Sequence, residues 1–546
     1  MHDARPRLTE WLLTREGRGN PHTRLDDRHP DGVAWSTGNL ARPLVHGATY
    51  FAALADVLDG VGEGDLVCFT DWQGNPDERL RGTPGSELVE VLGRALDRGA
   101  DVRALVWRSH AGRLGYAVDE HRDLGRLLQA RGADVQLDMR VRASGAHHQK
   151  FVVVRHGDDP ARDVAFVGGL DLCHTRRDDA RHLGDPQGDP IAHEYGERPP
   201  WHDVQLELRG PAVHDVETVF RERWEDSTPL TRSPVRRVRD RLDRLDDERR
   251  RLPEQRPAPD ELGPHTVQLL RTYPSLGPGW KHDFAPRGER SVARGYTQAM
   301  RRARSLVYIE DQFLWGRAMS QVFVEALRAN PDLHVVAVLP RVPDQDGWFA
   351  RDPQVLGRMR AIARVTAAAP DRVALYAPEN QAGTPVYVHA KVCVIDDVWA
   401  SVGSDNFCRR SWTHDSELSA VVVDTDSEDG SSSYGRRLRL ALAGEHLDRV
   451  DVDALGPIGP EADEHLLDVM ADCVGGREMF ERLAASADAL EAWHAGGRQG
   501  LRPPGRLRRL PTPRLPWPRR LLAAPWYALL HDPDGRRWTD RLRRRL

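Results

Sequence analysis

Two histidine–lysine pairs in this chain have the same spacing and contain two of its three lysines. His148 precedes Lys150 by two residues, and His389 precedes Lys391 by two. Only three lysines occur among the 78 lysines and arginines, and the third is Lys281. A lysine ammonium is a compact charge that can fit beside another cation on one phosphate oxygen, whereas the guanidinium of arginine is a broad fork. The pairs therefore predict a site that handles a phosphate group.

Two histidines could divide the work of cleaving a phosphodiester. An imidazole titrates at about pH 6.5, so one ring can be neutral and attack while the other is protonated and serves as an acid. The two ammonium groups would neutralise charge on the non-bridging oxygens. These cations make a metal unnecessary, and no acidic cluster with metal-ligand spacing accompanies the pairs. We therefore predict neither a metal nor another cofactor.

Each pair opens the same succession of residues. The apolar runs 151–154 and 392–395 are typical of buried strands, and second apolar runs follow at 164–167 and 399–402. Residues two apart on a strand point to the same side, so the histidine and lysine of each pair would face one site. Both units end in turns of small and polar residues, which are Gly168, Gly169 and Asp171 in the first and Gly403, Ser404 and Asn406 in the second.

A single histidine at a strand start is usually a surface or core residue without a chemical role, and the apolar runs are ordinary core strands. Two copies with matching downstream turns favour the functional interpretation instead. The duplicated pattern resembles the phospholipase D superfamily, whose mark is H-x-K-x4-D followed by G-G/S-x-N/D. The second copy matches throughout, including Asp396. The first copy has Arg155 in place of the acid, followed by a short polar insertion.

Further similarities to the family lie at 201–203, 308–313, 409–417 and 437–447, so the family-like region runs from about Gly47 to about Leu447. The resemblance implies that His148 attacks phosphorus and that His389 protonates the leaving group and then activates water or an alcohol. Asp203 and Glu417, each of which follows its own motif, would hold the Nδ1–H of the two rings. The predicted catalytic set is His148, Lys150, His389, Lys391, Asp396, Asn406, Asp203 and Glu417, and the predicted phosphate-binding or supporting set is Ser404, Gly168, Gly169, Asp171, Glu310 and Gln312.

Helices and strands alternate in the same order before each motif, which predicts an α/β fold with helices outside a mixed sheet. The first half is expected to contain helices 50–58 and 86–98 and strands 65–70 and 102–107, and the second half helices 292–303 and 320–329 and strands 306–310 and 333–339. The resemblance implies two similar halves, each a mixed sheet flanked by helices, with the site at their pseudo-twofold interface. The predicted domains are an N-terminal extension 1–46, half one 47–231, a charged and Pro-rich linker 232–262, half two 263–447, and a helical and Arg/Pro-rich C-terminal region 448–546.

Composition narrows the partners and the compartment. A formal net charge of −5 gives no reason to expect nucleic acid as a partner. The 5 cysteines are scattered without C-x-x-C spacing, which fits a reducing cytoplasm. The sequence shows neither a Sec signal nor an apolar run long enough to cross a bilayer, so we expect a cytoplasmic protein that is soluble or peripheral on a membrane. The basic, aromatic segment from Leu501 either lies in a membrane interface or wraps over the domain.

The resemblance leaves more than one reaction open, and the sequence sets no oligomeric state. The segments 168–173 and 201–203 look closest to the phosphatidylcholine-hydrolysing branch. The favoured function is therefore hydrolysis of a glycerophospholipid to phosphatidate and a head-group alcohol, with transphosphatidylation as a side reaction. The alternatives are a cardiolipin-synthase-like phosphatidyl transferase and a catalytically inactive lipid-binding module in which Arg155 marks decay of the motif.

Overall fold

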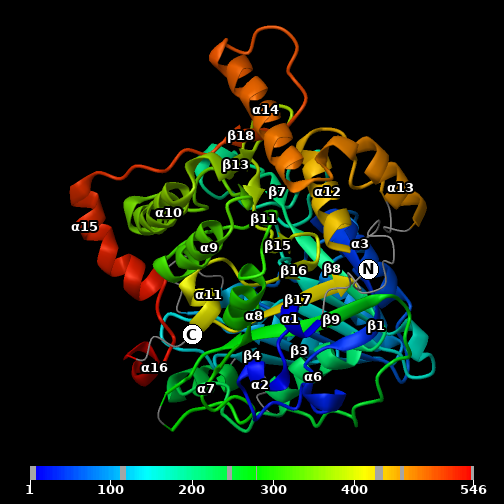
Figure 1. Ribbon diagram of the computed structural model, residues 1–546. Helices are drawn as coiled ribbons and strands as arrows, with labels where there is room; N and C mark the ends of the chain where they lie inside the picture. Colours follow the sequence, from blue (N-terminus) through cyan, green and yellow to red (C-terminus); the bar gives the residue numbers. More distant parts are fainter. Residues whose placement is uncertain are drawn as a thin grey trace.

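The centre of the molecule is a single mixed β-sheet with helices on its outer sides (Figure 1). The computed structural model describes residues 8–110, 118–242, 249–277, 279–424, 434–455 and 460–542. The strand order is β18-β13-β12-β11-β15-β16-β17-β9-β1-β8-β6-β5-β2-β3-β4. This order reads as two equivalent series that meet between β9 and β1, so the chain is a mixed α/β protein built from two related halves.

The first half places its two parallel pairs at the outer edge and its antiparallel pairs toward the centre. Its strands are β1 (Ser36–Val45), β2 (Leu66–Asp71), β3 (Asp101–Trp107), β4 (Asp134–Asp138), β5 (Phe151–Arg155), β6 (Val164–Gly168) and β8 (Val204–Arg209). Strands β2, β3 and β4 are parallel, whereas β5 and β6 run antiparallel to their neighbours. Its helices are α3 (Gly47–Asp59), α4 (Leu88–Asp97), α5 (Val118–Ala130) and α6 (Ala212–Glu225).

The second half repeats this pattern strand by strand. Its strands are β9 (His265–Tyr273), β11 (Leu306–Glu310), β12 (His334–Val338), β13 (Val373–Pro378), β15 (Val392–Ile395), β16 (Trp399–Gly403) and β17 (Glu417–Asp424). Again the outer three strands are parallel and the inner ones antiparallel. Its helices are α8 (Ser291–Met300), α9 (Arg317–Ala329), α10 (Trp348–Ala368) and α12 (Tyr434–His446).

Strands β1 and β9 join the halves by antiparallel pairing, so the two predicted sheets are one continuous sheet. Residues 36–45, which the sequence placed in an N-terminal extension, form β1 at the middle of it. Glycine, proline and polar residues interrupt this strand, so it lacks the apolar signature of the others. The pairing is short, with Ser36 opposite Val267 and Asn39 opposite His265, and it covers part of what would otherwise be two open sheet edges.

The apolar strands are buried on both faces, which explains why they read as continuous hydrophobic runs. In β5, Phe151 and Val153 contribute to a core shared by the two halves, whereas Val152 and Val154 face the core under α3, α4 and α5. Strand β15 repeats this alternation, with its outward residues under α8, α9 and α10. Strands β6 and β8 lie close to β16 and β17 across the shared core. The strands that follow both motifs are therefore brought face to face.

The C-terminal region adds elements around the second half. They are α13 (Pro460–Val469), α14 (Gly476–Ala495), β18 (Leu507–Arg509), α15 (Trp517–Trp526) and α16 (Trp538–Leu542). Strand β18 extends the sheet next to β13, and α15 lies at the outer edge of the molecule beside α10 (Figure 1). No helix in the part of the chain that the structure describes has the length and hydropathy needed to cross a membrane.

Candidate active site

Backbone hydrogen bonds between the halves position both histidines. The N–H of His148 donates to the carbonyl of Ser416 over 2.9 Å, and the N–H of His389 donates to the carbonyl of His202 over 2.8 Å. The short strands β14 (Tyr387–Val388) and β7 (Trp201–His202) pair in parallel, and a parallel bridge joins His147 to Ser416 in the equivalent place. Each motif therefore begins beside a segment of the other half.

This backbone pairing crosses the histidine–acid pairs. Nδ1 of His148 lies 2.9 Å from Oε2 of Glu417, and Nδ1 of His389 lies 2.6 Å from Oδ2 of Asp203. Sequence reasoning selected the two acids because each follows its own motif. In the structure, however, each acid binds the histidine of the other motif. Spacing along the chain cannot reveal this crossing because it depends on how the halves pack.

The two lysines are buried and occupy equivalent positions. Each ammonium donates to the carbonyl of its own histidine, and for Lys150 this distance is 3.0 Å. Beyond that bond their surroundings differ. Lys150 lies 3.5 Å from Asp171 and 5.6 Å from the ring centroid of Trp72, whereas Lys391 lies 3.5 Å from Oε1 of Gln312. Both ammonium groups therefore have few partners and keep donors for a ligand.

Burial and the two ammonium charges favour neutral imidazoles. They hold the pKa of His148 and of His389 well below the usual histidine range, and each lysine acts on both rings. Burial lowers the pKa of Lys391 to about 8, with Lys150 contributing in the same direction. Burial, together with nearby Asp415, raises the pKa of Glu417 to about 8. The two histidines and the two lysines thus influence one another's protonation, and the positive charge of the lysines would favour a bound anion.

The glycines after the first motif make room for the opposing strand and its acid. A Cβ on Gly168 would lie 2.3 Å from the side chain of Gln205, and a Cβ on Gly169 would lie 2.3 Å from Oδ1 of Asp203. In the second copy Ser404 takes the place of Gly169, and its hydroxyl donates to Oε2 of Glu417 over 2.6 Å. The structure therefore places these predicted phosphate-site residues behind the acids, where they support the site indirectly.

Asp171 and Asn406 end the two turns and take equivalent positions. Asp171 accepts hydrogen bonds from the N–H groups of Trp72 and Gln73 at 3.2 and 3.3 Å. Although burial opposes ionisation, Lys150 and a hydrogen bond from Asp71 lower the pKa of Asp171, while burial and Asp171 raise that of Asp71. Asn406 is buried, and its amide oxygen has no hydrogen-bond partner among the described residues. The first turn is anionic and the second neutral.

Comparison with known families agrees with this geometry. Residues 126–338 match the family model described as phospholipase D, and residues 297–432 match the one described as cardiolipin synthase, PLD-like domain. The two spans include both histidine–lysine pairs. The chain belongs to the phospholipase D superfamily.

Relatives within this superfamily are distant. The chain is 25% identical to phospholipase D alpha 1 of Cynara cardunculus over 72% of this chain and 64% of that protein. It is 24% identical to phospholipase D1 of Saccharomyces cerevisiae over 76% of this chain and 29% of that protein. The chain thus spans less than two thirds of the length of these relatives. The crystal structure of phosphatidylserine synthase from Haemophilus influenzae Rd KW20 has the same fold, with a TM-score of 0.50, 12% identity, and coverage of 75% of this chain and 88% of that one.

Behind the second motif of this superfamily member, Glu310 holds the segment that precedes Asp203. Its carboxylate accepts hydrogen bonds from Nε2 of His202 at 2.5 Å, Nε2 of His446 at 2.8 Å and the hydroxyl of Tyr308 at 2.6 Å. Gln312 donates to the hydroxyl of Tyr387 over 2.7 Å, and its oxygen faces Lys391. Glu310 therefore supports the backbone that binds His389, whereas Gln312 lies at the site itself.

A buried histidine–carboxylate cluster continues from His202. Oε1 of Glu445 lies 3.1 Å from Nε2 of His46, 2.8 Å from Nε2 of His182 and 3.1 Å from Nη1 of Arg506. Glu445 and His446 belong to the family-like segment 437–447, but nothing in the sequence singled out His46 or His182. Neither histidine belongs to the repeated pattern from which the motifs were identified.

Ligand atoms of His46, His182, His202 and Glu445 lie within 4.8 Å of one another, as do those of His202, Glu310 and His446, so both groups could hold a metal ion. The guanidinium of Arg506, however, shares an oxygen of Glu445 with two of the histidines. Although burial opposes it, the acidic side chains of Asp178 and Glu445 raise the pKa of His182 to about 9. A cation already present on the carboxylate fits an ion-pair network better than a metal centre.

The structure places Asp396 away from the histidines, which corrects its assignment to the catalytic set. Its carboxylate accepts the backbone N–H groups of Arg304, Ser305 and Leu306 at 2.6, 2.8 and 2.9 Å, just before β11. The four residues of β15 separate Asp396 from Lys391, which is on the order of 15 Å along a strand. Asp396 therefore fixes the start of β11.

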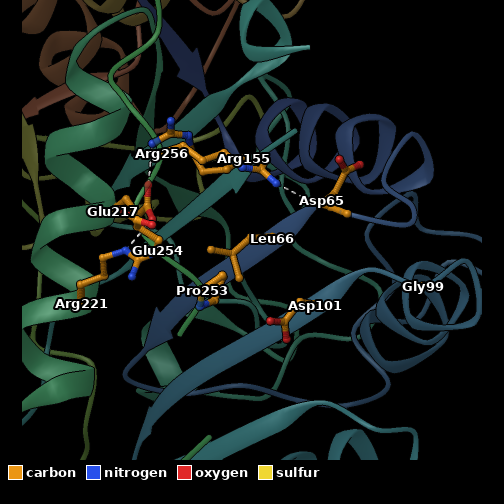
Figure 2. A pocket seen from close by; sticks show the side chains of 11 residues that line it. Asp65, Leu66, Gly99, Asp101, Arg155, Glu217, Arg221, Pro253, Glu254 and Arg256 are labelled. Carbon is orange, nitrogen blue, oxygen red and sulfur yellow. Dashed lines mark hydrogen bonds and ion pairs between the residues drawn. The ribbon is translucent and has the colours of Figure 1, made fainter. Parts of the chain in front are cut away.

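Arg155 occupies the corresponding place in the first half and forms a different set of ion pairs. Its guanidinium lies 2.7 Å from Asp163 and 2.5 Å from Glu217. The acid stands just before the neighbouring strand β2 instead, since Asp65 accepts the N–H groups of Gly62 and Gly157 at 3.0 and 2.8 Å. Figure 2 shows Arg155, Asp65 and Glu217 lining a cavity at this end of β5. The arginine at this motif position therefore changes a structural contact at the end of β5 that lies away from His148.

Proposed function

We propose that this chain is a phospholipase D-type phosphodiesterase that hydrolyses a glycerophospholipid to phosphatidate and a free head-group alcohol. The observation that carries the proposal is the pair of crossed histidine–acid contacts, each with a buried lysine two residues on. Two neutral imidazoles oriented by acidic side chains and two ammonium groups are the parts that in-line displacement at a phosphodiester requires. The family match and the relatives named phospholipase D support the substrate class.

His148 is assigned as the nucleophile. Its Nδ1 faces Glu417, which leaves Nε2 with the lone pair, and 15% of its side chain is exposed against 7% for His389. Nε2 attacks phosphorus, the bond from phosphorus to the head-group oxygen breaks, and the leaving oxygen takes a proton from His389. Water then gives a proton to His389 and attacks phosphorus. Phosphatidate leaves and His148 is restored.

The resting charge of the site explains how His389 gains the proton it donates. In the absence of substrate, burial and the two ammonium groups keep its pKa low. A phosphodiester anion between Lys150 and Lys391 cancels much of that positive charge, so the pKa of His389 rises when substrate binds. The amide of Asn406 and the lysines would then hold the non-bridging oxygens in the transition state.

A phosphatidyl transferase is the second candidate because residues 297–432 match the family described as cardiolipin synthase, PLD-like domain. In both reactions phosphorus becomes bonded to His148, and they differ in whether water or an alcohol attacks next. Head-group release from separate phospholipids, with and without added ethanol or phosphatidylglycerol and always in EDTA, distinguishes them. Release without an acceptor supports hydrolysis, and release only with an acceptor supports transfer. No release in either case would support the inactive lipid-binding module.

The roles of the two histidines can be separated with phosphatidyl-p-nitrophenol, whose leaving group needs no proton. His389→Ala should release about one equivalent of p-nitrophenol and then stall, because the histidine that activates water is gone. His148→Ala should release none, and His22→Ala, at an exposed histidine outside the site, should behave as the parent. The opposite pattern would exchange the two roles. Half of the parent activity in each variant would mean two independent sites and would reject the mechanism.

A further inference from the structure

Large apolar side chains are exposed on α15 and on the residues that follow it, up to Leu529. The exposed fractions are 71% for Trp517, 65% for Leu521 and 66% for Leu529. We call the group the apolar rim, and it consists of Trp348, Phe349, Trp517, Leu521, Leu522, Trp526 and Leu529. A contiguous exposed apolar surface on a folded protein usually marks a binding face.

The rim is continuous across two helices. The ring centroids of Trp348 and Phe349 are 4.3 Å apart, and those of Phe349 and Trp526 are 4.8 Å apart. Helix α15 packs beside α10 at the outer edge of the molecule (Figure 1). This contact joins the start of α10 to α15, so the aromatic and leucine side chains form one surface.

Side chains outside the rim also anchor α15 to the rest of the protein. Ala523 and Tyr527 on its inner side pack with Trp315 and Leu356 in a small core. The guanidinium of Arg519 pairs with Asp352, which lies on α10, at 2.5 Å. These contacts anchor the helix. Leu521 and Leu522 lie on its exposed side, away from this core.

The charge is positive along the part of the rim that α15 and its flanking residues contribute. Between Glu491 and Asp532 the sequence contains no acidic residue. Arg514 and Arg520 are exposed beside the apolar side chains, and neither forms an ion pair with the residues that the structure describes. Tryptophan and leucine with arginine alongside are the composition of helices that lie in the interface of an anionic bilayer.

The rim is linked to segments on both sides of the site, one beside Gln312 and one before His148. Trp315 contacts Tyr527, with ring centroids 6.4 Å apart, and stacks on Phe313, the residue after Gln312. On the other side, the hydroxyl of Ser144, four residues before His148, donates to the carbonyl of Leu529 over 3.1 Å. A surface that binds the rim would therefore lie next to the chain segments that enter the site.

We infer that the apolar rim docks the protein on the surface of a phospholipid bilayer. Its aromatic and leucine side chains enter the boundary between head groups and acyl chains, and Arg514 and Arg520 bind anionic head groups. The inference rests on the proposed function for the identity of the substrate. What it adds is that the enzyme takes its substrate from a bilayer that the rim holds beside the site.

The test compares the double variant Leu521→Glu/Leu522→Glu with the parent and with Leu183→Glu, a control at an exposed leucine outside the rim. Cosedimentation with vesicles of phosphatidylcholine and phosphatidylglycerol in equal parts should fall by about tenfold or more in the double variant, because two carboxylates would have to enter the interface. Activity on these vesicles should fall in parallel. Activity on a short-chain phosphatidylcholine below its micelle concentration should stay at the level of the parent.

Two further measurements make each outcome decisive. Arg514→Ala/Arg520→Ala should weaken binding to the anionic vesicles and leave binding to pure phosphatidylcholine unchanged. Light scattering should show one oligomeric state for the parent and the double variant, and a parent oligomer that the variant loses would make the rim an interface between copies. Unchanged vesicle binding, or an equal loss on monomeric substrate, would overturn the inference. Vesicle binding without turnover of any lipid would reject the proposed function and leave the docking surface standing.

Discussion

His148 and Glu417 are 269 residues apart in the chain, yet a 2.9 Å hydrogen bond joins them across the two halves. His389 and Asp203 make the equivalent contact in the opposite direction. Each half thus supplies a histidine to its own motif and a carboxylate to the motif of the other half. One half alone would contain a histidine without an acid to orient it.

Replacing either acid by its amide should impair catalysis without unfolding the protein. Glu417→Gln and Asp203→Asn keep the size of the side chain but put an NH2 donor in place of one carboxyl oxygen, so the tautomer of the ring is no longer fixed. We expect kcat to fall by roughly 10³- to 10⁴-fold in each, as for the aspartate of a catalytic triad. The measurement is steady-state turnover of one phospholipid, with circular dichroism as the check on folding.

The crossing itself can be tested by nitrogen NMR of labelled histidine. Glu417→Gln should shift the Nδ1 resonance of His148 and leave that of His389 in place, and Asp203→Asn should do the reverse. Assignment uses His148→Ala and His389→Ala, each of which removes one signal. A shift confined to the histidine of the same half would contradict the structure.

Arginine should not replace the two motif lysines. Lys150→Arg and Lys391→Arg retain the charge but put a wide fork where Asp171 and Gln312 leave space for a compact ammonium. We expect kcat/KM to fall by roughly 10²-fold or more, the size of effect seen when one oxyanion donor is lost. Lys281→Arg is the matched control because Lys281 is exposed and outside both motifs. If all three variants match the parent, the placement of lysine carries no chemistry.

Activity should fall on the alkaline side of about pH 8. Burial lowers the pKa of Lys391 to about 8 in the free protein, so kcat/KM should decline as this ammonium loses its proton. Bound phosphate stabilises the charged form, which should move the decline in kcat to higher pH. The residual activity of Lys391→Arg should lack this limb because arginine stays charged. A limb that persists in that variant would assign it to another group.

The buried His182 should stabilise the fold most strongly in mild acid. Its pKa in the folded state is raised to about 9, above the value of about 6.5 in an unfolded chain. The stability it contributes is therefore complete below about pH 6.5 and is lost as the pH rises through 9. We expect His182→Gln to lower the free energy of unfolding by about 2 kcal/mol at pH 6 and by much less at pH 9.5. Urea unfolding of the parent and of His182→Gln at each pH measures this loss. Titration of the other groups affects both proteins and cancels in the comparison.

Restoring the motif acid in the first half should destabilise the protein. Arg155→Asp would place a carboxylate beside Asp163 and Glu217 and remove their guanidinium partner. Breaking a buried ion pair in this way typically costs about 3–5 kcal/mol. Since Arg155 lies at the opposite end of β5 from His148, kcat of the folded fraction should be unchanged. A gain in activity would show that the departure from the motif does limit catalysis.

Local patterns were sufficient to locate the strands around both motifs. The predicted strands 306–310 and 392–395 coincide with β11 and β15, because their apolar runs end at polar residues and both of their faces are buried. The family resemblance likewise placed both histidines and lysines. What spacing could not supply was contact between the halves, which decides the partner of Glu417 and makes His46 and His182 part of the support. Spacing also could not show that Asp396 lies at the end of β15 away from the histidines, because a repeated motif does not reveal how its residues are placed relative to a site.

The antiparallel pairing of β1 with β9 limits how this molecule can move. Many enzymes admit substrate by swinging two domains about a hinge, with the chemical groups assembled only on closure. Here the halves share a sheet, an apolar core, two backbone bridges and two histidine–carboxylate bonds. Any hinge motion would have to break all of them together. The catalytic cycle must therefore run on a rigid frame, with exchange of lipid and water left to side chains and loops at its surface.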